Sequence, residues 1–165
     1  MQLATVHRRF VATLIAATAM LSLLALLAAP LLRAADAPLV VVVGATSPMA
    51  DISRGNLRRS FLGEPTGASG GKLIPLNQPP GSAARRQFDR VVLGLEPQAV
   101  TQFWIDQRIR GLGGAPRAIA AAMLVRVVPQ IAGTIGYVRA NEIVAGIKAI
   151  TIDGKKPGEP GYLFE

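Results

Sequence analysis

The stretch LVVVVG, residues Leu39–Gly44, decides the fold class of this chain. Four valines follow a leucine, and β-branched residues favour strands because their side chains pack well on a pleated sheet. Apolar and polar residues do not alternate here, which is typical of a strand buried on both faces of a parallel sheet. We therefore predict a buried central strand within an α/β fold.

Strand and helix patterns alternate after this run. Predicted helices begin at Ser53, Ser82, Pro97 and Pro116, and further strands are expected at 72–76, 134–138 and 147–152. This alternation predicts that residues 36–165 form one three-layer α/β lobe with a mostly parallel central sheet.

Apolar spacing indicates which side of each element is buried. The helix after Ser53 places Leu57 and Phe61 on one face, four residues apart. Tyr137 is expected to be buried with its hydroxyl at the rim of the core. The helix after Pro116 is expected to bury its regularly spaced apolar residues, Ile119, Met123 and Val127.

Residues 1–35 have the features of an export segment. The basic cluster His7-Arg8-Arg9 precedes an uncharged, almost wholly apolar run over 10–32. This run can be the core of a cleaved signal peptide or an N-terminal membrane anchor, because it is long enough to span a bilayer. The basic residues before this run keep the N-terminus in the cytoplasm, so we expect the lobe outside the cytoplasmic membrane. We expect a periplasmic or otherwise extracytoplasmic lobe that touches the membrane only through this segment.

The composition excludes several classes of function. The chain has no cysteine, and its single histidine precedes the apolar run, so the lobe has no disulfide, no thiolate or histidine metal site and no Ser-His catalysis. Residues 1–35 hold three arginines and no acid, so about +5 of the formal net charge of +8 remains on the lobe. Its basic stretches lack the interleaved aromatic residues of nucleic-acid-binding proteins. Without paired-carboxylate spacing or a cofactor motif, we predict no enzyme and no cofactor.

The stretch NQPPGSAARRQF, residues 77–88, is the strongest candidate for a binding site. A Pro/Gly turn leads into Ser82, which can cap a helix, and Arg85 and Arg86 follow in the first turn. The helix dipole is positive at that end, so each arginine is locally unfavourable by about 0.3–1 kcal/mol unless an anion binds. Free N–H groups, a serine hydroxyl and guanidinium groups together predict an anion pocket.

Four motifs occur in the order and spacing of a known family. They are SRGNLRRSFLG, GSAARRQF, VVPQIAGTIGYV and IDGKKPGEPGYLF, and they lie within residues 39–164. In this order they resemble the phosphate-type periplasmic substrate-binding proteins of bacterial ABC importers, which have the type II periplasmic-binding-protein fold. The matched part is similar to the second lobe of such a receptor with two strands that cross its hinge, here Leu39–Gly44 and Gly161–Phe164. The resemblance implies a short, single-lobe member of the family.

The resemblance also implies ligand contacts at Gly81, Ser82 and Arg85. In the family, this turn presents backbone N–H groups and a hydroxyl to an oxyanion. The family pattern is Gly-Ser-Gly-Thr followed by Arg, and here Ala83 and Ala84 replace the second glycine and the threonine. One hydroxyl ligand is therefore lost, and a methyl group stands where the backbone should approach the ligand closely.

Thr46 and Ser47 are a second candidate contact, because open α/β sheets usually bind ligands after the carboxyl ends of their strands. Purely structural roles stay open as alternatives: Ser82 can serve as a helix cap alone, and Thr46-Ser47 can form an ordinary turn. Asp89, four residues after Arg85, can compensate part of the positive charge within the helix. Three further arginines flank a glycine loop and could edge a groove, namely Arg108, Arg110 and Arg117.

Two functions stay open at this point. The first is an exported solute-binding module that binds phosphate or a similar small oxyanion weakly, with ABC transporter membrane subunits as partners. The alternative is an envelope protein that keeps the fold but not the ligand site, and that docks onto another envelope protein through the open face where the missing lobe would sit. An apolar face exposed there would mark an interface. Phosphate should change the Trp104 fluorescence or the melting temperature only in the first case.

Overall fold

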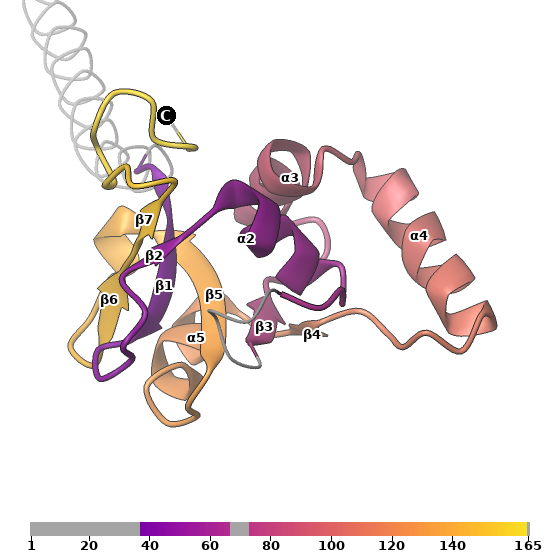
Figure 1. The fold of residues 1–165 in the computed structure, drawn as a ribbon, viewed down its shortest axis with the longest axis horizontal. Helices are drawn as coiled ribbons and strands as arrows, with labels where there is room; N and C mark the ends of the chain where they lie inside the picture. Colours follow the sequence, from indigo (N-terminus) through magenta and orange to yellow (C-terminus); the bar gives the residue numbers. More distant parts are fainter. Residues whose placement is uncertain (1–36, 67–72, 165) are drawn as a thin grey trace, which may run out of the picture. The chain divides into compact units, whose positions relative to one another are not determined.

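The computed structural model describes residues 37–66 and 73–164 (Figure 1). The chain divides into two units, Met1–Ala37 and Pro38–Glu165. All the helices and strands described below belong to the second unit. The predicted export segment, 1–35, lies outside the described residues, so its cleavage or retention stays a prediction. Among the described residues, no helix has both the length and the apolar character needed to cross a membrane.

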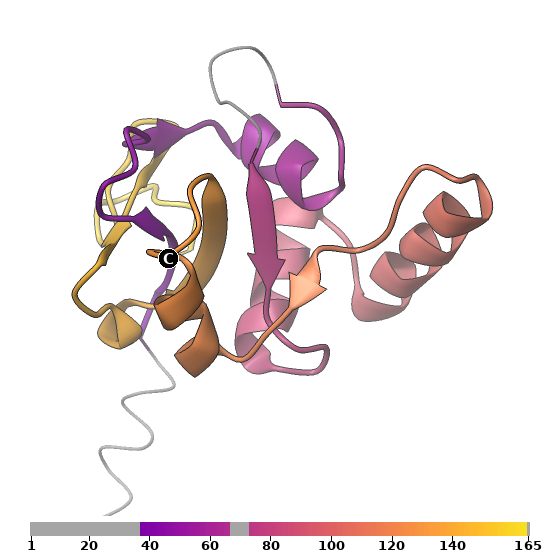
Figure 2. The ribbon, with the colours of Figure 1, turned by 90° about the horizontal axis from the view of Figure 1, so that it is seen from below.

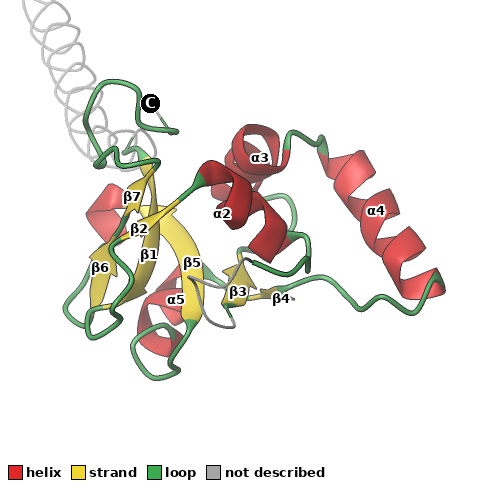
Figure 3. Ribbon diagram, in the orientation of Figure 1, coloured by secondary structure: helices red, strands yellow, loops and turns green. Residues whose placement is uncertain are grey.

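Five strands form the central sheet of the second unit, in the order β4-β3-β5-β1-β6 (Figure 3). They are β1 (Leu39–Gly44), β3 (Ile74–Asn77), β4 (Arg117–Ala118), β5 (Thr134–Arg139) and β6 (Ile147–Ala149). Strand β3 is parallel to β4 and β5, whereas β1 is antiparallel to β5 and β6. Four strands thus run in one direction and β1 in the other, so the sheet is mostly parallel, as predicted. A separate parallel pair joins β2 (Asp51–Ile52) to β7 (Thr151–Ile152).

Strand β1 has the predicted burial but not the predicted direction. All of its residues are buried, so the unbroken apolar run does mark a central strand. Both neighbouring strands run against it, and the expected parallel environment is therefore wrong for this strand. An unbroken apolar run indicates that both faces of a strand are buried, and this burial does not depend on the direction of the neighbouring strands.

Helices cover both faces of the sheet, as predicted for a three-layer α/β lobe. Successive side chains of a strand point to opposite faces, and Gly136 and Tyr137 of β5 show what each face meets. A Cβ on Gly136 would lie 2.9 Å from a methyl carbon of Leu124, so the helix that contains Leu124 packs on that face. The Tyr137 ring lies 5.9 Å from that of Phe61 and 4.0 Å from that of Phe88. The helices concerned are α2 (Arg54–Phe61) and α3 (Ala83–Phe88) on one face and α5 (Ala121–Val127) on the other (Figure 2).

Helix boundaries follow the predicted capping residues. The Ser53 and Ser82 hydroxyls each accept a hydrogen bond from the backbone N–H three residues on, at the starts of α2 and α3. Helix α3 continues into a π-helical turn, η1 (Asp89–Leu93), which ends at Gly94 with φ 67°. This left-handed conformation suits glycine, as expected at a helix end.

Helix α4 (Pro97–Ile109) has its proline in the first turn, as predicted. It stands beside the sheet and away from the other helices (Figure 1). Val100 is its only fully buried residue, and Phe103 and Trp104 are partly buried. Two isoleucines of this helix stay in contact with solvent, with Ile105 47% and Ile109 79% exposed.

The helix predicted to begin at Pro116 begins later and buries a different face. The two residues after the proline form β4 on the edge of β3, and α5 follows. The backbone N–H of Ile119 donates to the Asn77 carbonyl oxygen at 2.8 Å, so the edge of β3 binds this segment before a helix can begin. Leu124 is consequently fully buried, whereas Met123 is 51% exposed.

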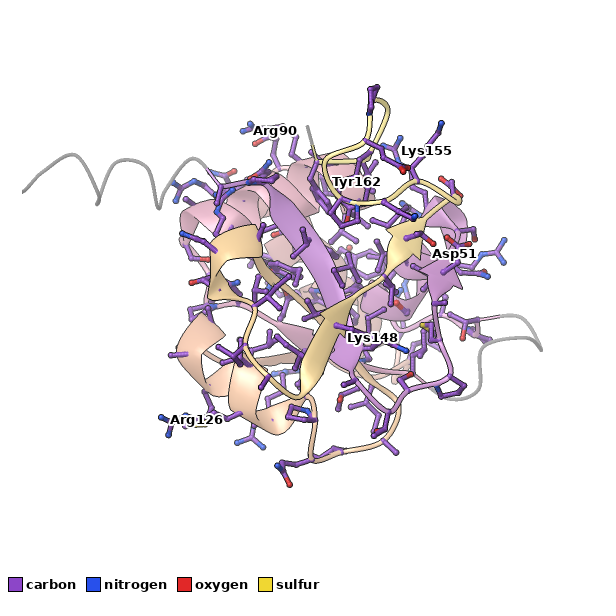
Figure 4. All side chains as sticks on the ribbon, turned by 90° about the vertical axis from the view of Figure 1, so that its left-hand side faces the viewer. Asp51, Arg90, Arg126, Lys148, Lys155 and Tyr162 are labelled. Carbon is purple, nitrogen blue, oxygen red and sulfur yellow. The ribbon has the colours of Figure 1, made fainter. Side chains whose placement is uncertain are left out.

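The C-terminal part also departs from the prediction. The strand expected over 147–152 is divided into β6 and β7 at Ile150, whose N–H donates to the Val41 carbonyl oxygen. Residues 161–164, implied as a hinge strand, form turns and no strand. Tyr162 and Phe164 are nevertheless buried, and Figure 4 shows Tyr162 within the C-terminal segment. These two aromatic side chains pack into the core, although the backbone of the segment forms no strand.

Candidate functional site

The turn between β3 and α3 holds three of the predicted contact residues, Gly81, Ser82 and Arg85. Gly81 has φ 85°, a conformation that other residues rarely adopt. The Ser82 hydroxyl accepts the Arg85 backbone N–H at 3.1 Å. A serine hydroxyl that accepts one bond keeps its own O–H to donate elsewhere. The turn is therefore built as predicted, while contact with a ligand stays a prediction.

Arg85 is engaged within the protein and is buried. Its Nε donates to both carboxylate oxygens of Asp89, at 2.6 and 2.8 Å, and a terminal nitrogen donates to the Gln78 carbonyl oxygen at 3.3 Å. Burial raises the pKa of the Asp89 carboxyl, and the hydrogen bond and charge of Arg85 oppose that shift. The charge of Arg85 is thus compensated by Asp89, as their four-residue spacing allows, and contact of Arg85 with a ligand stays a prediction.

A buried polar network that sequence reasoning missed holds the turn in place. The Tyr137 hydroxyl donates to Asn77 Oδ1 and accepts the backbone N–H of Gln78 at 3.2 Å. Gln78 Nε2 donates to the Tyr137 carbonyl oxygen at 2.9 Å. The hydroxyl of Tyr137 thus lies inside the core and not at its rim, and burial raises its pKa. Asn77 and Gln78 precede the Pro/Gly turn directly, but the sequence gives no sign that their partner lies about 60 residues away.

A groove lies between this turn and α4, and we call it the arginine groove. Its cavity has a volume of about 420 Å³. Gly81, Arg85, Arg86 and Asp89 line one side, and Trp104, Ile105, Arg108 and Ile109 of α4 line the other. Arg86 donates a hydrogen bond to the Gly81 carbonyl oxygen, which holds its guanidinium beside the turn. Arg108, which the sequence marked as a possible groove edge, therefore does border a cavity.

The arginine groove carries a surplus of positive charge. In the part of the chain that the structure describes, the ion pairs are Arg85–Asp89 and Arg90–Glu96. Neither pair uses Arg86 or Arg108, and Asp89 is already bound to Arg85. The groove is therefore suited to a negatively charged group.

Thr46 and Ser47, the second candidate contact, lie at the opposite edge of the sheet from Gly81 and Ser82. Because β1 runs against the other strands, its carboxyl end meets the amino ends of β3 and β5. The Ser47 backbone carbonyl accepts a hydrogen bond from Nζ of Lys148 at 2.6 Å, on the side seen in Figure 4. The two predicted contact pairs therefore lie at opposite ends of the strands, and ligand contact at Thr46 and Ser47 stays a prediction.

Asp51 and Asp106, two carboxylates considered as possible catalytic groups, accept hydrogen bonds from neighbouring residues of the lobe. Asp51 accepts hydrogen bonds from the hydroxyl of Thr151 and the backbone N–H of Gly154. Asp106 accepts from Gln102 Nε2 at 2.9 Å, one turn earlier in α4. Within residues 37–66 and 73–164, no cluster of histidine, aspartate or glutamate could hold a metal ion.

A larger and mainly apolar cavity, which we call the apolar groove, lies between α2, β3 and α5. Its volume is about 920 Å³. Ile74, Met123 and Ile131 line it and are partly exposed, and Arg117 is its only arginine among the lining residues. Its walls include none of the predicted contact residues.

The fold matches that of solved phosphate receptors. An ABC-type phosphate transport receptor from Vibrio cholerae aligns with 73% of this chain at 18% identity and a TM-score of 0.57. A putative phosphate ABC transporter substrate-binding protein from Clostridium perfringens, solved with bound phosphate, aligns at 15% identity and a TM-score of 0.59. PstS from Borrelia burgdorferi aligns at 16% identity and a TM-score of 0.53. The family resemblance predicted from the four motifs is thus confirmed at the level of the fold.

The chain spans about half the length of these receptors, since the matched region covers 48%, 47% and 49% of theirs. No protein-family model and no curated protein sequence matches this chain. These identities establish the shared fold, and the ligand has to be inferred from the chain's own residues.

Proposed function

We propose that this protein is an exported solute-binding module that binds phosphate or a similar small oxyanion weakly in the arginine groove. The observation that carries the proposal is the position of Arg86 and Arg108, two arginines outside any ion pair of the described residues, on either side of a cavity next to Gly81. Gly81 lines the groove, and Ser82, the next residue of the turn, keeps an O–H that can donate to the same anion. The shared fold of phosphate receptors supports this choice of ligand.

The expected affinity is modest. Arg86 and Arg108 are exposed, so water and salt screen their charges. We expect a dissociation constant in the high micromolar to millimolar range, or about −4 to −6 kcal/mol.

Titration calorimetry of the full-length chain with phosphate, sulfate and acetate tests the proposal. Arg86→Gln and Ser82→Ala should each weaken phosphate binding, and added salt should weaken it further. Arg126→Gln is the matched control, because Arg126 is an exposed arginine of α5 that lines neither groove. No heat with any anion, or equal heats for all variants, would refute oxyanion binding at this turn.

The partner-docking function is the second candidate, and the apolar groove is the observation that favours it. Exposed apolar side chains gathered along one cavity are typical of an interface. In that case phosphate leaves the melting temperature unchanged, and Met123→Ser abolishes capture of the envelope partner without destabilising the lobe.

We further propose that the lobe lies outside the cytoplasmic membrane, with ABC transporter membrane subunits or another envelope protein as its partner. The apolar run over 10–32 with its basic flank supports this location. An alkaline phosphatase fused after Gly44 should be active in cells. A fusion that is made in full but inactive would refute export.

A further inference from the structure

We propose that the arginine groove accepts an organic anion with an apolar body, and that such a ligand binds more tightly than inorganic phosphate. This inference deepens the proposed function, on which it rests, by naming the ligand class of the same groove. The shared chemistry is a carboxylate or phosphate-monoester head group on an aromatic or branched aliphatic body.

The first argument is the size of the groove. A cavity of about 420 Å³ lies within the roughly 300–1,000 Å³ range of pockets that bind small organic molecules. Inorganic phosphate would occupy only the part beside Arg86 and Arg108. Most of the other side chains that line the groove are apolar.

The second argument is the chemistry of that remaining wall. Trp104, Ile105 and Ile109 of α4 face the groove, and Pro80 and Pro116 add apolar surface from the other side. Ile109 is 79% exposed, so a ligand body that covers it removes apolar surface from water. A small anion that contacts only the arginines leaves this apolar surface exposed to water.

The third argument is that cationic and apolar side chains line the same cavity together. Arg85 is neutralised by Asp89, so the effective positive charge comes from Arg86 and Arg108. Arg108 is four residues after Trp104 and directly before Ile109, so the cationic and apolar side chains come from the same stretch of α4. An anionic head can therefore bind the arginines while an attached body contacts the isoleucines and the indole ring.

Trp104 makes the test direct, because it is the only tryptophan of the chain and lines the groove. The full-length chain is titrated with phenyl phosphate, phenylacetate, inorganic phosphate and benzyl alcohol while Trp104 fluorescence is recorded. Phenyl phosphate should bind at least tenfold more tightly than inorganic phosphate, which corresponds to about 1.4 kcal/mol. Benzyl alcohol, which has the ring without the charge, should bind at least tenfold more weakly than phenyl phosphate. Phenylacetate shows whether a carboxylate head serves as well as a phosphate.

Two pairs of variants locate the effect. Arg108→Gln should weaken phenyl phosphate binding at least fivefold, whereas Arg110→Gln, which changes a neighbouring exposed arginine outside the groove, should not. Ile109→Ser should reduce the advantage of phenyl phosphate over phosphate by at least threefold while leaving phosphate binding unchanged. Val144→Ser is its control, because Val144 is 48% exposed and lines neither groove.

The outcomes separate this inference from the function on which it rests. Phosphate binding that is equal to or tighter than phenyl phosphate binding overturns the inference and leaves the proposed function standing. Phenyl phosphate binding without any phosphate binding supports the inference and refutes the phosphate-type function. Binding of neither anion, or an effect of Ile109→Ser no larger than that of Val144→Ser, overturns the inference.

Discussion

The aromatic cluster of the core and helix α4 differ sharply in how much of each is covered. In the cluster, Phe61, Phe88 and Tyr137 are fully buried against one another, and the tyrosine hydroxyl is bonded inside the core. In α4, only Val100 is fully buried, and Ile109 is mostly exposed. The covered region holds the fold, while the uncovered helix leaves apolar and cationic side chains free to meet a ligand. Four substitutions test this division.

The largest effect is expected from Asp89→Ala, which leaves Arg85 buried without its ion-pair partner. Breaking a buried ion pair at one end typically costs about 3–5 kcal/mol of stability, measured here by urea unfolding. Glu96→Ala breaks the exposed Arg90–Glu96 pair and should cost less than about 1 kcal/mol. A cost for Asp89→Ala no larger than that for Glu96→Ala would contradict the buried pair. The double variant Arg85→Met, Asp89→Leu should recover much of the stability, because it removes both charges.

The next largest effect is expected from Gly136→Ala, on the α5 face of the sheet. The added methyl group would lie 2.9 Å from a Leu124 methyl carbon, and overpacking of this kind costs about 1–3 kcal/mol. Combined with Leu124→Ala, the same change should cost less than the sum of the two single effects, because the smaller side chain makes room. Strict additivity in thermal or urea unfolding would show that Gly136 and Leu124 do not meet.

Ser82→Ala should have an intermediate effect, through loss of the helix cap. The expected cost is about 0.5–2 kcal/mol, and Ser53→Ala, which removes the matching cap of α2, should cost about the same. Only Ser82→Ala should also weaken phosphate binding in calorimetry. If both variants bind phosphate like the parent protein, Ser82 is a cap alone.

The smallest effect on stability is expected from Ile109→Ser, since this side chain buries little surface. Its unfolding free energy should stay within about 0.5 kcal/mol of the parent value. A loss above about 1.5 kcal/mol would mean that α4 packs far more tightly than its exposure indicates.

The difference between the two regions also explains what could be predicted from sequence. Local signals predicted the caps at Ser53 and Ser82 and the central strand at Leu39–Gly44, because each depends on neighbours in the chain or on burial alone. The reversed direction of this strand was missed, since strand direction is set by pairing with segments about 100 residues away.

The candidate site was predicted in part for the same reason. The turn at Gly81 and the Arg85–Asp89 spacing are visible in the sequence, but the burial of this pair depends on distant elements. Arg108 was marked as a possible groove edge, but the sequence did not show that α4 lies opposite the Gly81 turn, because that depends on the fold. Thr46 and Ser47 were proposed as a second contact because they follow the first strand, and the reversed direction of β1 places them away from Gly81 and Ser82.

Mapping of backbone amide and indole N–H chemical shifts during a phosphate titration tests the central claim most directly. The account predicts that the largest shifts occur at Gly81, Ser82 and the Trp104 indole, because Gly81 and Trp104 line the arginine groove and Ser82 directly follows Gly81 in the turn. Arg86→Gln should diminish all three shifts together. The account is contradicted if these resonances stay still at millimolar phosphate, or if the shifts gather instead at Ser47 on the opposite edge of the sheet.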